Sequence, residues 1–162
     1  PMDEIELYLP GALGARQTEA ALEKVNRRVQ GHGLVLQEAE IQALAKRREE
    51  VLQSTGRVEF GEGILPKLVF LFCDSPYIPQ QEYAATLDAL QACFYHFKNE
   101  TGEAVGDDDL LEFMKTHFDG DCHGSVEYLE GTLLEHLARG IRLGGQEEEP
   151  PDEEGEEGED EE

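Results

Sequence analysis

Residues 79–98 constrain the fold most strongly, because their large apolar side chains recur at the spacing of an α-helix. Tyr83, Leu87, Leu90, Phe94 and Phe97 follow one another at intervals of four, three, four and three residues. That spacing places all five side chains on one helical face. Such a face has to be buried against other elements, so this segment is predicted to be the central helix of a packed domain.

Five further segments carry helical signals. They are residues 17–30, 37–54, 64–73, 108–118 and 125–139. The inward face of the second segment is predicted to hold Ile41, Leu44, Ala45, Arg48, Val51 and Leu52. The last segment is predicted to bury Val126, Leu129, Leu133 and Leu137 and to stop at Gly140. The third is almost wholly apolar after Pro66, so a short buried helix is the simplest interpretation, with a buried strand as the alternative.

The glycine-rich segment 56–63 differs from the rest. Apolar and charged residues alternate in it between glycines, which is typical of a very short strand or an extended loop. One such segment cannot found a sheet. The chain is therefore predicted to be all-α, a compact bundle of about six helices with a short extended glycine-rich segment.

The composition changes at Gly144, and this sets the predicted domain boundaries. Residues 147–162 contain 12 acids and no hydrophobe, so no apolar burial offsets the entropy of ordering them. We expect residues 144–162 to be a disordered acidic tail and residues 16–143 to be a single helical domain. Residues 1–15 are expected to be a partly ordered N-terminal segment.

The charge balance restricts the class of partner. The chain has 37 acids against 13 bases, a net charge of −24. A surface of that sign repels phosphate groups, so no nucleic acid and no membrane is expected as a partner. A protein or a cation is expected instead. The three cysteines, Cys73, Cys93 and Cys122, are few and widely spaced, which favours reduced thiols in a cytoplasmic protein.

Most bases lie in the first third of the chain. They are Arg16, Lys24, Arg27, Arg28, Lys46, Arg47, Arg48 and Arg57. Two interpretations follow. The acidic tail either folds back over these helices and competes with an acidic partner, or it keeps the protein in solution beside ordinary solvated helix faces.

Residues 119–130 nearly spell a calcium-binding EF-hand loop. The eligible oxygen ligands are Asp119, Asp121, Ser125 through its carbonyl, Glu127 and Glu130. His123, however, stands where an oxygen ligand is needed, and no second loop of this spacing occurs in the chain. Calcium is thus a possible cofactor, with no other cofactor expected.

A capped corner between two helices explains the same residues without a metal. In that interpretation, Gly120 ends one helix, Gly124 adopts a special backbone conformation and Ser125 caps the next helix. A zinc site can also be drawn from Cys93, His96, His117, Cys122 and His123, although it lacks the tight paired spacing of structural zinc sites.

Catalytic motifs with a known mechanism are missing from the sequence. It contains no GxSxG, Walker, Rossmann or HExxH string. An unrecognised enzyme remains an alternative. Its cleft would be lined by charged residues near the glycine-rich segment and by two tyrosines, namely Arg57, Glu59, Glu62, Lys67, Asp74, Tyr77 and Tyr83.

Three strings carry a family resemblance. GRVEFGEGILPKLVFLFCDSPYI (56–78), FYHFKNET (94–101) and FDGDCHGSVEYLEGT (118–132) resemble a bacterial family of short proteins classified as a domain of unknown function. The resemblance covers residues 30–142. It implies a bacterial cytosolic origin, and the family brings no assigned activity, cofactor or catalytic residue.

These observations favour a non-catalytic protein-interaction or accessory module, with calcium binding and catalysis as alternatives. The expected contact region lies within residues 56–78. It contains Phe60, Tyr77 and Ile78, which stand outside the helical stripes and are expected to be exposed.

Overall fold

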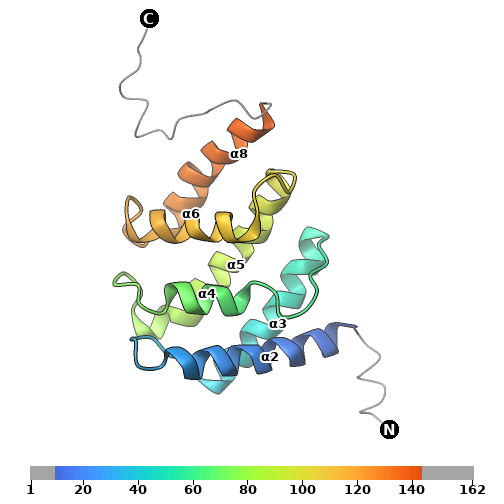
Figure 1. The fold of residues 1–162 in the computed structure, drawn as a ribbon, viewed down its shortest axis with the longest axis vertical. Coiled ribbons are helices and arrows are strands. Elements are labelled where there is room, and N and C mark those ends of the chain that lie inside the picture. The colour runs from blue at the N-terminus through green and yellow to red at the C-terminus, as the bar shows by residue number, and fades with distance from the viewer. Residues whose placement is uncertain (1–9, 144–162) are drawn as a thin grey trace, which may run out of the picture. The chain divides into compact units, whose positions relative to one another are not determined.

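The computed structural model describes residues 10–143, with side chains from residue 14 onward (Figure 1). Helices and loops make up these residues, and no strand occurs among them, which confirms the all-α prediction. The chain divides into two compact units within helix α5 (Tyr83–Glu100), between Tyr95 and His96. The single domain expected over residues 16–143 stays a prediction. Residues 1–9 and the acidic tail at 144–162 lie outside the described residues.

The first unit is built around α2 (Pro10–Val29), which begins earlier than the sequence pattern suggests. Helices α3 (Glu38–Thr55) and α4 (Leu65–Phe72) both pack against α2, and α4 lies beside it in Figure 1. A single 3₁₀ turn, η1 (Gln80–Glu82), then leads into α5. The loops between these helices bring the glycine-rich segment close to α2 and α3.

Helix α3 has clear signals at both ends. The Glu40 carboxylate accepts a hydrogen bond of 2.7 Å from the backbone N–H of Gln37, which satisfies a free donor at the helix start. The helix ends before Gly56, whose φ of 69° lies in the left-handed region. Its buried residues are the six that the sequence pattern predicts, Arg48 included, so that prediction is confirmed.

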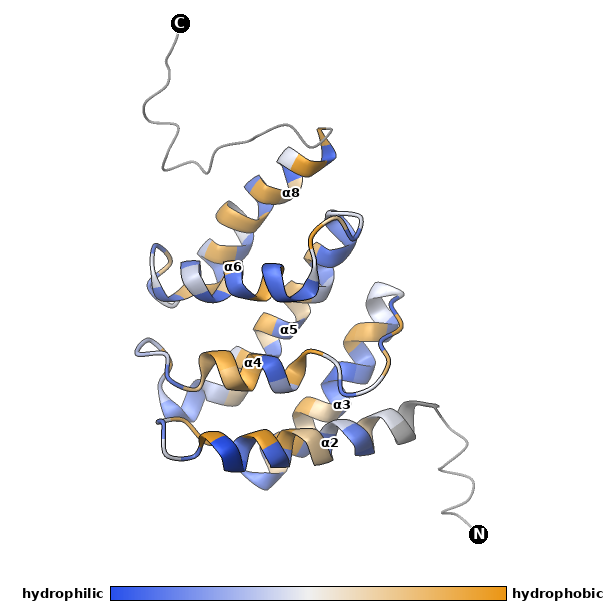
Figure 2. Ribbon diagram, viewed as in Figure 1, coloured by the Kyte–Doolittle hydropathy of each residue, from blue (hydrophilic) through white to orange (hydrophobic). Residues whose placement is uncertain are grey.

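Helix α4 shows that residues 64–73 contain a short buried helix and not the buried strand that was the alternative. Pro66 stands in its first turn, where a missing N–H costs nothing. The helix is mostly apolar (Figure 2), and Leu65, Leu68, Val69 and Phe72 are buried. Phe70 points the other way and is 55% exposed. The segment before α4 contains no strand, so residues 57–60 form an extended loop.

The second unit contains α6 (Asp107–Asp119), α7 (Val126–Tyr128), the π-helix η2 (Leu129–Leu134) and α8 (Glu135–Arg142). The last three follow one another without a break, and α6 packs against η2. A π-turn holds extra residues compared with an α-turn and therefore shifts the register of the helix that follows. Leu137 is half-buried for this reason, and Ala138 takes its expected place in the core. This corrects the predicted stripe, of which Val126 is also only half-buried. The helix does not stop at Gly140, which is buried within α8, and instead ends at Arg142.

Candidate functional surface

The centre of the first unit holds a buried cation. Arg48 projects from α3 and is 1% exposed. Its Nε lies 2.7 Å from the Glu59 carboxylate, and its Nη2 donates a 3.2 Å hydrogen bond to the Glu59 carbonyl. One guanidinium thus holds both the side chain and the backbone of the loop residue. A buried charge of this kind requires a partner, and Glu59 supplies it.

Three further side chains complete the polar cluster. The Glu49 carboxylate accepts a 3.2 Å hydrogen bond from Arg48 Nη1. Arg48 Nη1 donates a 2.9 Å hydrogen bond to the Thr18 hydroxyl on α2, and the Tyr95 hydroxyl donates to the Glu59 carboxylate. Burial and the nearby Glu59 charge raise the pKa of Tyr95, so its hydroxyl remains a donor. Burial disfavours the charged form of Arg48, but the hydrogen bond and charge of Glu59 outweigh this effect and raise the Arg48 pKa. The cluster is therefore a fully paired structural clamp.

Gly63 shows how tightly the clamp fits. Its φ is +77°, and a Cβ built at this position would lie 2.2 Å from Glu59 Oε1 and 3.0 Å from Arg48 Nε. A side chain here would collide with the ion pair itself. Glycine at this position therefore meets both a backbone requirement and a spatial one.

The clamp fixes the direction of the neighbouring side chains. Exposure alternates along residues 57–60: Glu59 is half-buried against Arg48, and Val58 and Phe60 on either side of it are exposed. Val58 is 75% exposed and Phe60 is 88% exposed. Two apolar side chains are thus presented to solvent on a backbone that a buried ion pair holds in place.

Helices α2 and α4 extend this exposed area. Arg28 on α2 places its guanidinium carbon 6.0 Å from the ring centroid of Phe70 on α4, within reach of a cation–π contact. Lys24 stands one turn before Arg28 and lines a hollow together with Gly61, next to Phe60. Val58, Phe60, Phe70, Lys24 and Arg28 form what we call the Phe60 surface.

Tyr77 and Ile78, the other two residues of the expected contact region, are less exposed than Phe60. Tyr77 is 40% exposed, and its backbone N–H donates a 3.3 Å hydrogen bond to the Ser75 hydroxyl. Ile78 is only 6% exposed, so the expectation that it is a surface residue is corrected. Its aliphatic side chain joins the core at the start of the turn that leads to α5.

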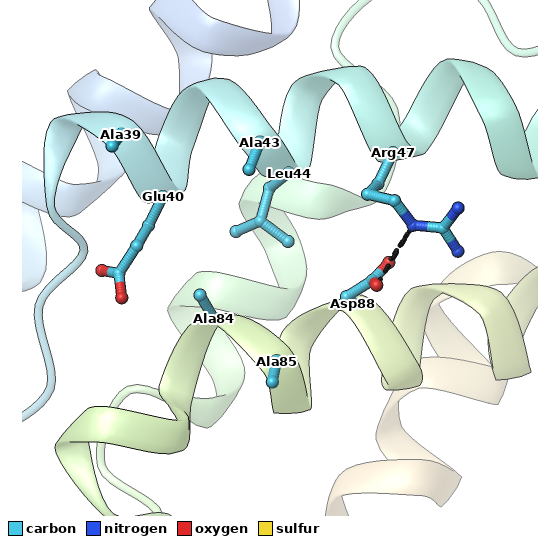
Figure 3. Close-up of a pocket in the computed structure, with 8 residues that line it drawn as sticks. All are labelled: Ala39, Glu40, Ala43, Leu44, Arg47, Ala84, Ala85 and Asp88. Atoms are coloured by element: carbon cyan, nitrogen blue, oxygen red, sulfur yellow. Dashed lines mark hydrogen bonds and ion pairs between the residues drawn. The ribbon is translucent and has the colours of Figure 1, made fainter.

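A shallow groove between α3 and α5 is the other notable feature of this unit (Figure 3). Four alanines line it, Ala39, Ala43, Ala84 and Ala85. At one end Arg47 Nε lies 3.1 Å from Asp88, and Arg47 also pairs with Glu50 at 2.7 Å. These ion pairs raise the pKa of Arg47 and keep it charged. The groove is lined by small apolar side chains and by a cation that is already paired. Such a lining does not resemble a catalytic site.

The acidic residues at 119–130 are arranged as a helix corner. Asp119 lies 3.2 Å from Lys115, and Asp121 lies 3.4 Å from the ring of His117. The Ser125 hydroxyl accepts a 3.1 Å hydrogen bond from the backbone N–H of Tyr128 and so caps α7. Glu127 follows in α7 and Glu130 in η2. These features match the capped-corner interpretation.

Glycines complete the corner. Gly124 has a φ of +83°, as that interpretation requires. A Cβ at Gly120 would lie 2.8 Å from the Thr116 carbonyl oxygen, so the end of α6 also needs a glycine. Across residues 10–143, no three His, Cys, Asp or Glu side chains are grouped so that they could hold a metal ion. Calcium binding by this loop stays a prediction that requires a titration.

All three cysteines are buried thiols. Burial, together with the neighbouring Asp121 charge, raises the pKa of Cys122 to about 11. A thiol with such a pKa is neither a ready nucleophile nor a ready metal ligand at neutral pH.

The side chains that were expected to line a catalytic cleft do not share one environment. Glu59 is bound to Arg48. Tyr83 is buried, and burial raises its pKa. Its hydroxyl has no hydrogen-bond partner among the described atoms, and it cannot line an open cleft.

The sequence interpretation missed Val58, Phe70, Lys24 and Arg28 as surface residues, and it missed the pairing of Arg48 with Glu59. A signal for the pairing exists. Arg48 lies on the apolar face of α3, where a cation needs an acidic partner, and Glu59 lies between two hydrophobes that need not be buried with it. Phe70 follows from the helical wheel of α4, on which it lies opposite the buried residues.

The chain is thus an all-helical protein with an exposed apolar surface beside a buried ion pair. It belongs to a family of unknown function (DUF6323), whose model matches residues 21–147. The resemblance to a family of unknown function is therefore confirmed. No curated protein and no solved structure matches the chain. In residues 10–143, no helix is both long and apolar enough to cross a membrane.

Proposed function

We propose that this protein is a non-catalytic interaction or accessory module of the bacterial cytosol, and that its partner protein binds the Phe60 surface. One observation carries the proposal. Phe60 is almost fully exposed, while the residue beside it is bound to a buried arginine. A loop that served only to connect α3 and α4 would need neither the apolar side chain nor the clamp.

The energetics favour binding. Burying a phenylalanine side chain contributes roughly 1.5–3 kcal/mol. Ordering a loop on binding normally offsets part of that gain, but a loop that is already held loses little further entropy. Arg48 therefore increases the affinity of the Phe60 surface without touching the partner.

The proposed location rests on the cysteines and on the family resemblance. All three cysteines are buried thiols, and reduced thiols are typical of a reducing compartment. The bacterial origin is what the family resemblance implies.

Photo-crosslinking tests the proposal directly. The full chain is expressed with a benzophenone amino acid in place of Phe60, and in a second version in place of Leu143, which is also exposed. Irradiation of cells should give a discrete protein adduct at position 60 that weakens when Val58→Ser is added. The same adducts from position 143, or none from position 60 in a folded protein, would contradict the proposal.

A further inference from the structure

The Phe60 surface combines hydrophobes with cations, and this combination restricts the chemistry of its partner. A hollow of about 350 Å³ lies between α2 and residues 61–62, which follow Phe60 in the sequence. It is lined by Gln17, Ala20, Ala21, Lys24, Gly61 and Glu62. Lys24 supplies a positive charge on its α2 side, and Glu62 supplies a negative charge on its loop side.

The cations of α2 continue from this hollow to Phe70. Lys24 and Arg28 are four residues apart, so they lie on the same helical face. Both are exposed, and among the described side chains neither has an acidic partner at ion-pair distance. Arg28 instead covers part of the Phe70 ring at 6.0 Å. In the row formed by Phe60, Lys24, Arg28 and Phe70, two positive groups therefore stand between two aromatic side chains.

Lys24 and Arg28 differ in this respect from other cations of the described residues, such as Arg47 and Lys98, which are paired with acids. The chain as a whole has a net charge of −24. Unpaired cations beside exposed aromatic rings attract an acidic group, and electrostatic complementarity of this kind steers association and selects the partner.

We infer that the partner presents to the Phe60 surface an acidic peptide segment that carries at least one apolar side chain. This inference rests on the proposed function and adds the class of partner. The apolar side chain packs against Val58 and Phe60, and the carboxylates meet Lys24 and Arg28. Glu62 keeps the acidic groups on the α2 side of the hollow.

The acidic residues 147–162 of this same chain match the charge of the Phe60 surface but not its apolar part. They carry 12 acids, which match the cations, but no hydrophobe. They would leave Val58 and Phe60 exposed to water. A separate segment with both properties is the better match, and residues 147–162 are its competitor in the test.

Fluorescence anisotropy with four labelled synthetic peptides tests the inference on the full chain. One peptide combines glutamates with two leucines, one has the same charge with serines for the leucines, and one has the same leucines with glutamines for the glutamates. The fourth is the sequence 147–162. We expect the first to bind most tightly, and to bind about tenfold more weakly to the variant Lys24→Glu with Arg28→Glu.

A matched control has the same change in total charge. Lys46→Glu with Arg139→Glu reverses two exposed cations outside the Phe60 surface, and it should leave the affinity almost unchanged. Phe60→Ser should weaken binding of the first peptide as well, and added salt should weaken it further.

The outcomes distinguish the inference about an acidic partner from the proposed function of the Phe60 surface. Equal affinity for the uncharged leucine peptide overturns the acidic partner and leaves the Phe60 surface in place. Equal affinity for the serine peptide or for the sequence 147–162 also overturns it, because charge alone then suffices. Binding by none of the four overturns it too, whereas the adduct at position 60 decides the proposed function by itself.

Discussion

Arg48 Nε lies 2.7 Å from the Glu59 carboxylate, and this contact joins the core of the first unit to the loop that carries the exposed Phe60. Glu59 faces inward because Arg48 needs a charge partner, whereas its neighbour Phe60 is exposed to solvent. A single buried ion pair thus decides which side chain the loop presents to solvent.

Removal of the acidic partner should be costly. Glu59→Gln removes the nearer carboxylate of the buried Arg48 and leaves only Glu49, whose carboxylate lies 3.2 Å from Arg48 Nη1. We expect the free energy of unfolding to fall by about 3 kcal/mol in urea titrations. Asp88→Asn is the matched control, because it removes one of the two acidic partners of the exposed Arg47. That variant should lose less than about 1 kcal/mol. Similar losses in both variants would show that the Glu59 pair is no more important than a surface ion pair.

Alanine variants of Gly61 and Gly63 separate the cost of backbone strain from the cost of a close contact with the ion pair. Gly61 and Gly63 have similar φ values, +70° and +77°, but a Cβ at Gly61 meets nothing within 4 Å. Gly61→Ala should cost about 1 kcal/mol, from the left-handed conformation alone. Gly63→Ala should cost clearly more, because its Cβ collides with Glu59. Thermal unfolding of the two variants side by side provides the comparison, and equal costs would speak against the tight fit of the clamp.

Much of this fold follows from the sequence, because helical stripes are a strong local signal. The inward face of α3 is the clearest case, since all six predicted residues are buried. Non-local pairing is harder to predict, because the place of Arg48 on the apolar face of α3 indicates that it needs an acid but does not identify Glu59 as that acid. Residues 48 and 59 meet only because the loop after α3 folds back, and nothing in either segment fixes that distance.

The last helix shows a second feature that the sequence pattern does not predict. Leu129 and Leu133 follow the stripe correctly, but the π-turn shifts the register so that Ala138 replaces Leu137 in the core. A π-turn depends on packing rather than on a residue motif. The acidic loop is a third case, because its residue types suit both a calcium loop and a capped corner, and only the geometry shows the capping bond from Tyr128 to Ser125.

The capped corner makes a prediction of its own. Ser125→Ala should lower the free energy of unfolding by about 1 kcal/mol through loss of the cap, and Ser125→Asp should retain it. Calcium should leave the thermal midpoint of the natural protein and of Glu130→Gln unchanged. A calcium-dependent rise that Glu130→Gln abolishes would instead establish a metal site at residues 119–130.

The Cys122 thiol should respond to pH in a defined direction. Its pKa in the folded protein is raised to about 11, above that of an ordinary thiol, so the folded state favours the protonated form. The stability that depends on this thiol is present below the ordinary thiol pKa and is lost as the pH rises toward 11. Iodoacetamide should label Cys122 slowly at pH 8 in the folded protein and rapidly in urea. Fast labelling of folded protein at pH 8 would contradict the raised pKa.

The most direct test of the Phe60 surface compares stability and binding in one variant. Phe60 contributes little to the core, so Phe60→Ser should change the free energy of unfolding by less than about 0.5 kcal/mol. The same variant should lose the protein that the natural chain captures from cells, and the control Leu143→Ser should retain it. Retention of that protein by Phe60→Ser, with or without a loss of stability, would contradict the account.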